Sequence, residues 1–270
     1  MELVRPLLLS ITAATRLLIV SPHPDDGALA AAGLVSRVVR ARGSVEVVQM
    51  TSGDAFSEGV KKIDRTDRPT PDDYRAYGLR RERETIAAMG TLGVPASQIT
   101  FLGFPDDGLC LLSSAYSAVQ FESPYTRRRS PPDGERLLDD VGYRGRDVVR
   151  ELQQIIARFK PTIVVIPAPA DEHPDHCSTH RFVTRALGDR PSARVLHYVI
   201  HGRQPDRAEA LALTRRETAA KRRAIEAYRS QTLIIGDFMR KFENGRELFV
   251  EDDPSPLPPC WCRDENIAKP

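Results

Sequence analysis

Two short stretches of this sequence carry side chains of the types that bind divalent metals in proteins. They are His23-Pro24-Asp25-Asp26 and His173-Pro174-Asp175-His176. Imidazole nitrogen and carboxylate oxygen are ligands for zinc and for ferrous iron. Three of these side chains, His23, Asp26 and His176, would hold one such metal and leave coordination positions open for water and substrate.

Both stretches lie where a strand-like segment gives way to a helix-like one. The apolar runs 17–19 and 162–166 precede them in the sequence. Ligands bind open α/β sheets at the carboxyl ends of the strands, so the two stretches meet there if their strands are neighbours in one sheet. Taken alone, Asp25 or Asp26 also fits a helix cap, because a carboxylate accepts hydrogen bonds from free backbone N–H groups. The second stretch favours the metal site.

The alternation of strands and helices predicts one α/β domain with a three-layer, Rossmann-like fold and a mainly parallel sheet. We place the active site at the carboxyl ends of its strands. The domain spans 1–270, with a core at 16–251, an irregular insertion at about 109–142 and a Pro-rich tail at 252–270. The polar segments 55–73 and 109–142 follow strands at the active-site edge. We expect them either to contact the remote part of a substrate or to be solvated surface loops.

The composition is typical of a soluble globular protein. The 270 residues are 41% apolar and 28% charged, with a formal net charge of +2. The basic residues form no stripe, so nucleic-acid binding is not predicted. No run approaches the roughly 18 apolar residues that span a bilayer, so stable membrane insertion is not expected.

The four cysteines are not spaced as a disulfide framework. They are Cys110, Cys177, Cys260 and Cys262. We therefore expect a reduced, cytoplasmic protein. Two thiols in Cys260-Trp261-Cys262 are of the type that binds zinc, but without a second pair they favour no metal site. Homo-oligomerisation is left open.

Further motifs extend a family resemblance over most of residues 16–251. Besides the two metal-type stretches they are Arg81-Glu82-Arg83-Glu84 leading to Leu92-Gly93-Val94, Phe101-Leu102-Gly103-Phe104-Pro105-Asp106, Tyr228-Arg229-Ser230-Gln231 and Arg246-Glu247-Leu248-Phe249. The sequence resembles the LmbE-like, or PIG-L-type, metal-dependent deacetylases of N-acetylglucosaminyl groups. The first two stretches as a pair are specific to that family, whereas each of the others is weak alone.

The resemblance implies that His23, Asp26 and His176 bind one divalent metal, zinc in the first place and Fe(II) as the alternative. It implies that Asp25 is the general base, and that His173 stabilises the oxyanion or protonates the leaving amine. The substrate would be an N-acetylated sugar or glycoconjugate, whose acetamide is a poor electrophile. A metal-bound water with a lowered pKa, together with a polarised carbonyl, overcomes that difficulty.

Other residues have supporting roles in this interpretation. Arg81 falls on a family arginine associated with substrate binding. Asp106 is expected to contact a substrate hydroxyl, although Asp106 and Asp107 also fit a plain turn. Asp175 is expected to fix an imidazole tautomer behind the metal ligands.

One position departs from the family pattern. Gly27 stands where the family usually has glutamate, which puts support of the metal site in doubt more than activity. Two alternatives follow: an amidase of the same fold that acts on another acyl or conjugate group, and a sugar-binding homologue with impaired catalysis. A non-haem iron oxygenase also uses two histidines and one carboxylate, but the strand–helix alternation disfavours it.

The remaining histidines carry weaker signals. His180 has the helical spacing of a zinc pair with His176, but a packing role is favoured because such spacings are common. His197 lies within an apolar strand and is expected in the core. His201 follows that strand at the edge of the expected site, where a substrate contact is open.

Overall fold

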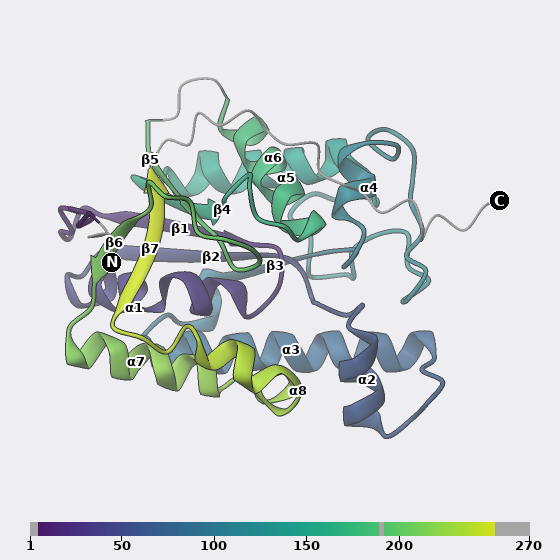
Figure 1. Ribbon diagram of the computed structural model, residues 1–270. Coiled ribbons are helices and arrows are strands. Elements are labelled where there is room, and N and C mark those ends of the chain that lie inside the picture. The colour runs from purple at the N-terminus through teal and green to yellow at the C-terminus, as the bar shows by residue number, and fades with distance from the viewer. Residues whose placement is uncertain (1–4, 189–191, 252–270) are drawn as a thin grey trace.

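The computed structural model describes residues 5–188 and 192–251. A central seven-stranded sheet has the strand order β3-β2-β1-β4-β5-β7-β6. Figure 1 shows α5 and α6 on one face of this sheet and α1, α3 and α7 on the other. The predicted three-layer α/β fold is confirmed.

Five neighbouring strands form the parallel part of the sheet. They are β1 (Arg16–Ser21), β2 (Ser44–Thr51), β3 (Ile99–Phe104), β4 (Ile163–Pro167) and β5 (Arg194–Tyr198). Two edge strands, β6 (Glu209–Ala212) and β7 (Arg246–Glu251), run antiparallel to each other, and β7 also runs antiparallel to β5. The prediction of a mainly parallel sheet is therefore correct.

Helices lie between most of the consecutive strands in the chain. They are α1 (Asp26–Arg40), α2 (Ser57–Asp64), α3 (Pro71–Thr91), α4 (Leu109–Ser113), α5 (Gly145–Phe159), α6 (Pro174–Leu187), α7 (Arg215–Glu226) and α8 (Arg229–Arg240), with a short 3₁₀ helix at Ala96–Gln98.

Side chains of β1 alternate between two hydrophobic cores. Leu17 and Ile19 belong to the core beneath α1, whereas Leu18 and Val20 belong to the core beneath α5 and α6. A strand covered on both faces needs apolar residues in both sets of positions, which explains the uninterrupted apolar run. Strand β1 pairs in parallel with β4, with Leu17 opposite Ile163.

Two elements near the carboxyl edge differ from the sequence expectation. Segment 55–73 was expected to be a polar loop, but it contains α2 and the start of α3. Helix α2 buries only Gly59 and Val60, so it leaves almost no apolar period in the sequence. Helix α8 was not expected either. Its helical run is broken at Ile235, where φ is −116° and ψ is 30°.

The expectation of reduced cysteines is wrong for the two that are described. Cys110 and Cys177 are buried, and both are disulfide-bonded. The spacing of these two cysteines in the sequence gives no sign of disulfide bonding. Cys260 and Cys262, the weaker metal candidates, lie outside the described residues. Within residues 5–188 and 192–251, no helix has the length and apolar character that crossing a membrane requires.

Candidate active site

The two metal-type stretches meet at the carboxyl ends of β1 and β4, which are neighbours in the sheet. His23 Nδ1 and His176 Nε2 are 3.3 Å apart. Each of these nitrogens lies 3.2 Å from Asp26 Oδ2. All three side chains are buried.

This spacing fits a divalent metal held by the three predicted ligands. Ligand atoms about 2.0–2.2 Å from a tetrahedral zinc are separated from one another by roughly 3.3–3.5 Å. His173 and His201 lie at the margin of the same cluster, since each has a nitrogen within 4.8 Å of a potential ligand atom on two of the predicted ligand residues.

A carboxylate stands behind each of the two histidines. Asp171 Oδ2 is 3.1 Å from His176 Nδ1, and Asp106 Oδ1 is 3.1 Å from His23 Nε2. Such carboxylates fix the tautomer and ring orientation of a metal-binding imidazole and raise its basicity. Burial lowers the pKa of His176, but Asp171 and Asp26 outweigh it and raise that pKa to about 9. Protons would therefore compete with a metal for His176 Nε2.

Asp171 was not predicted from the sequence. Its carboxylate also accepts hydrogen bonds from the backbone N–H groups of His173 (3.1 Å), Ile200 (2.7 Å) and His201 (3.2 Å). These contacts join the exits of β4 and β5 behind the predicted metal ligands. The sequence did hold one indication of this role, because Asp171 lies two residues before His173 in the loop that follows a strand.

Replacing Asp171 with asparagine should weaken metal binding by about 10-fold to 100-fold. The amide keeps the shape of the side chain but removes the negative charge beside His176. Metal titration in competition with a chelator measures the change. Asp206, an exposed aspartate, offers a matched control as Asp206→Asn, and equal metal affinity in both variants would contradict the role of Asp171.

Asp25 forms a buried ion pair with Arg81. Arg81 Nη2 is 2.7 Å from Asp25 Oδ1, and Arg81 Nη1 donates to the Gly53 carbonyl oxygen at 2.8 Å. A Cβ atom on Gly53, where φ is 63°, would lie 1.8 Å from Arg81 Nη1. Only glycine permits this approach. Arg81 borders the cavity. Its guanidinium is already bonded to Asp25 and to the Gly53 carbonyl, so its observed role is to hold Asp25 in place and not to contact the substrate.

His173 is the N-cap residue of α6 and faces the cavity. Its Nδ1 accepts a hydrogen bond from the Asp175 N–H at 3.2 Å, so the ring proton of the neutral form is on Nε2. Desolvation lowers the pKa of His173, and the charges of His23 and His176 lower it further. The side chain is thus a neutral hydrogen-bond donor.

Asp175 lies between His173 and His176 in the sequence, but its carboxylate does not lie between their rings. It accepts hydrogen bonds from the N–H groups of Asp107 (2.8 Å) and Leu109 (3.1 Å). Its Oδ2 is 3.7 Å from His23 Nε2. Asp175 therefore stands near His23, while Asp171 is the carboxylate beside His176.

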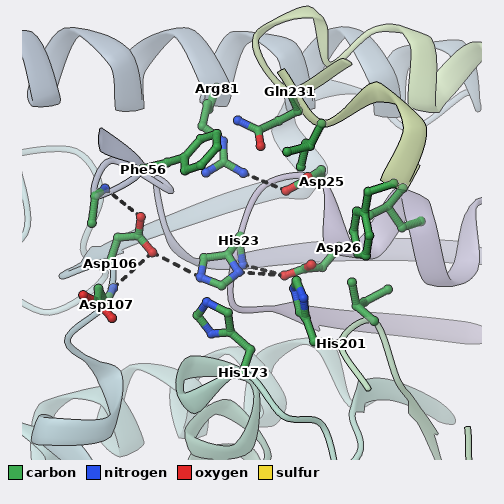
Figure 2. Close-up of a pocket in the computed structure, with 15 residues that line it drawn as sticks. His23, Asp25, Asp26, Phe56, Arg81, Asp106, Asp107, His173, His201 and Gln231 are labelled. Carbon is green, nitrogen blue, oxygen red and sulfur yellow. Dashed lines mark hydrogen bonds and ion pairs between the residues drawn. The ribbon is translucent and has the colours of Figure 1, made fainter. Parts of the chain in front are cut away.

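Asp106 borders the cavity, but its oxygens already have partners. Oδ1 contacts His23, and Oδ2 accepts a hydrogen bond from the Ala55 N–H at 2.7 Å (Figure 2). The geometry supports a role in holding His23 more than the expected contact with a sugar hydroxyl. Its neighbour Asp107 accepts a hydrogen bond from the Tyr125 hydroxyl at 3.0 Å. Burial and two nearby carboxylates raise the pKa of Asp107 to about 6.

The profile of the PIG-L family, described as GlcNAc-PI de-N-acetylase, matches residues 18–187. The chain belongs to the PIG-L family. The matched span contains both metal-type stretches, as the sequence resemblance predicted.

A PIG-L relative from Mycobacterium sp. (strain KMS), a 1D-myo-inositol 2-acetamido-2-deoxy-alpha-D-glucopyranoside deacetylase, is 30% identical over 178 residues. The alignment covers 64% of this chain but only 50% of that relative. The chain thus spans about half the length of the curated relative that it matches.

Solved structures share the fold at low sequence identity. N,N'-diacetylchitobiose deacetylase from Pyrococcus horikoshii has a TM-score of 0.58 and 19% identity, covering 87% of this chain and 82% of that one. A 4-carboxy-2-hydroxymuconate hydratase from Pseudomonas putida KT2440 has a TM-score of 0.57 and 15% identity, covering 90% and 98%. The fold therefore serves more than one reaction, and the reaction must be argued from the site.

A cavity of about 480 Å³ opens beside the ligand cluster of this PIG-L protein. Figure 2 shows His23, Asp25, Asp26, His173 and His201 around it. Helix α8, which the sequence analysis missed, lines it with Gln231, Ile235 and Phe238. The ring of His201 stacks on Phe238, with centroids 5.4 Å apart. This places His201 at the site, where a substrate contact had been left open.

The expected substrate loops contribute unequally to the cavity. Ala55 and Phe56 from segment 55–73 line it. Within the described residues, segment 109–142 supplies no lining residue. Its Tyr125 donates a hydrogen bond to Asp107, which does line the cavity.

The other two histidines lie away from the ligands. His180 Nδ1 is 3.2 Å from the Pro167 carbonyl oxygen, and His197 Nδ1 is 3.1 Å from the Val250 carbonyl oxygen. Both positions agree with the packing roles favoured from the sequence.

Gly27, the departure from the PIG-L pattern, faces the sheet. A Cβ atom there would lie 2.9 Å from Ser21 Oγ and 3.3 Å from Ile19 Cγ2. Gly27 is not among the described residues that line the cavity. A side chain at this position would therefore start against β1, where there is little room for it.

Proposed function

We propose that this protein is a metal-dependent hydrolase that removes the N-acetyl group from an N-acetylglucosamine-type sugar or glycoconjugate. The main supporting observation is the close triangle of His23 Nδ1, Asp26 Oδ2 and His176 Nε2, with sides of 3.2–3.3 Å. Two of its members, His23 and Asp26, line a cavity that Asp25 and His173 also line. The names of the family and of the mycobacterial deacetylase support the amide of an acetamido sugar as the bond cleaved.

His23, Asp26 and His176 would hold the metal, which we assign as zinc because nitrogen and oxygen ligands in a three-residue set with open positions suit it. When bound, it would lower the pKa of a water molecule and polarise the acetamide carbonyl. Fe(II) satisfies the same ligand set, so the metal must be identified by analysis.

Asp25 is the group we assign to take the proton from the attacking water. Arg81 holds Asp25 through Oδ1 at 2.7 Å, which fixes the carboxylate, and we assign its Oδ2 to receive the proton. The same carboxyl would then deliver a proton to the leaving amine. General-base catalysis of this kind requires a carboxylate within hydrogen-bond reach of the water.

His173 is the group we assign to the oxyanion. Its Nδ1 accepts from the Asp175 backbone, so its Nε2–H is available to donate a hydrogen bond to the carbonyl oxygen as negative charge develops there. A donor held in place before the reaction stabilises such charge without reorganisation. The lowered pKa of His173 favours this role over that of a cationic acid.

Zinc-loaded protein should release free amine and acetate in equal amounts from simple 2-acetamido-2-deoxyglucosides. A chelator should abolish the release, and added zinc should restore it. Amine detection with acetate quantification measures the reaction, and elemental analysis should give about one metal per chain. Protein that binds the glycoside and one metal but releases no amine would instead support the impaired sugar-binding homologue.

A further inference from the structure

One side of the cavity is apolar and takes no part in the chemistry assigned above. We call it the apolar wall, formed by Leu29, Ile200, Ile235 and Phe238. Leu29 and Ile200 are members of the hydrophobic core beneath α1, and Ile235 and Phe238 pack against that core. The wall is therefore drawn from α1, the exit of β5, and α8.

The break in α8 shapes this wall. Ile235 leaves the helical conformation, with φ −116° and ψ 30°. The ring of Phe238 lies parallel to that of His201 within 12° at 5.4 Å, and Lys241 Nζ is 5.7 Å from the same ring. These neighbours occupy part of the Phe238 ring, which leaves less of its face for a sugar to stack on.

Apart from its histidines, the charged side chains among the described cavity residues are four carboxylates and one arginine. Asp25, Asp26, Asp106 and Asp107 line it. Among the described lining residues, Arg81 is the cation, and its guanidinium is already bound to Asp25 and to the Gly53 carbonyl. A phosphate needs charged or N–H donors to replace its water, and the apolar wall supplies neither.

A polyol such as inositol is also poorly matched to this wall. Each hydroxyl that enters an apolar environment without a partner loses its hydrogen bonds to water. An apolar group gains on the same transfer, in proportion to the area removed from water. The wall therefore discriminates by chemistry between the two classes of substituent.

The wall lies close to the reacting centre. His201 has a nitrogen within 4.8 Å of the ligand atoms of Asp26 and His176, and its ring stacks on Phe238. In a 2-acetamido sugar, the anomeric carbon is bonded to the carbon that carries the acetamide. With that acetamide at the metal ligands, the anomeric substituent is within reach of the apolar wall.

We infer that the substrate is a 2-acetamido sugar whose anomeric substituent is an uncharged apolar group, aromatic or aliphatic, bound against Leu29, Ile200, Ile235 and Phe238. The inference rests on the proposed deacetylase function and specifies its substrate class. It sets this protein apart from the inositol glycoside named for its mycobacterial relative.

The test compares three 2-acetamido-2-deoxyglucosides that carry phenyl, methyl or inositol at the anomeric position. The zinc-loaded protein should show a kcat/KM for the phenyl glycoside at least about tenfold above that for methyl, since burial of a ring of this size contributes at least that factor. The inositol glycoside should be no better than methyl. A preference for inositol, or equal values for phenyl and methyl, would overturn the inference.

A matched pair of variants on α8 tests the wall itself. Ile235→Asn should reduce the phenyl-to-methyl ratio several-fold, because it places an amide in the wall. Leu233→Asn makes the same kind of change two residues away on a side chain that is 61% exposed, and it should leave the ratio unchanged. Equal ratios in the two variants would remove Ile235 from the wall.

Binding of the amine products keeps this test separate from the proposed function. Calorimetry with phenyl and methyl 2-amino-2-deoxyglucosides needs no turnover, and the phenyl compound should bind at least about tenfold more tightly. If no acetamide is cleaved but this preference appears, the deacetylase proposal fails and the apolar wall stands. If acetamides are cleaved but the products bind equally, the wall fails and the deacetylase stands.

Discussion

Asp25→Asn should lower kcat by about 100-fold to 10,000-fold while the protein keeps its metal. The amide preserves the size of the side chain but cannot accept the proton of the attacking water. Arg81, 2.7 Å from Asp25 Oδ1 in the native protein, would still find an oxygen acceptor in asparagine, so the local structure should persist.

Steady-state rates of amine release and the metal content of the same preparation measure this effect. Asp237→Asn is the matched control, because Asp237 is an exposed aspartate on α8. A near-normal kcat for Asp25→Asn would show that another group accepts the proton. Loss of metal from that variant would instead place Asp25 among the ligands.

His176→Ala should remove metal binding at stoichiometric concentrations, and activity with it. The substitution deletes one of three ligand atoms and leaves Asp26 and Asp171 without the imidazole between them. The loss of affinity should exceed the roughly 10-fold to 100-fold expected for a change behind the ligands, such as Asp171→Asn.

Helix α6 supplies the control for this variant. His180 lies one turn beyond His176 and contacts the Pro167 carbonyl, so His180→Ala should retain about one metal per chain. Elemental analysis after dialysis gives the metal content, and circular dichroism shows whether each variant is folded. Unchanged metal content in folded His176→Ala would contradict the ligand assignment.

The convergence of the two metal-type stretches could be predicted because both directly follow strongly apolar strands. Strands buried on both faces are easily recognised in a sequence, and adjacency of β1 and β4 then brings His23 and His176 together. The general α/β fold follows from the same alternation. These features depend on local sequence and one topological rule.

Features that depend on packing between distant segments were missed. Asp171 carries no mark of its role until β4 and β5 are placed side by side. Helix α8 lines the cavity and is broken at Ile235, and no proline at that position predicts the break from the sequence. Arg81 was recognised through the family, but its ion pair with Asp25 could not be read from residues so far apart in the chain.

The carboxylate of Asp171 joins two regions that have been treated separately. It contacts His176 among the proposed ligands, and it holds the backbone of Ile200 and His201, next to the apolar wall. Thermodynamic linkage requires that coupling between two binding events be reciprocal. If metal binding orders this carboxylate, it also orders the exit of β5, and a sugar whose substituent packs there would in turn tighten the hold on the metal. One coupling free energy, transmitted by Asp171, would then contribute both to the affinity for the metal and to the affinity for the sugar substituent.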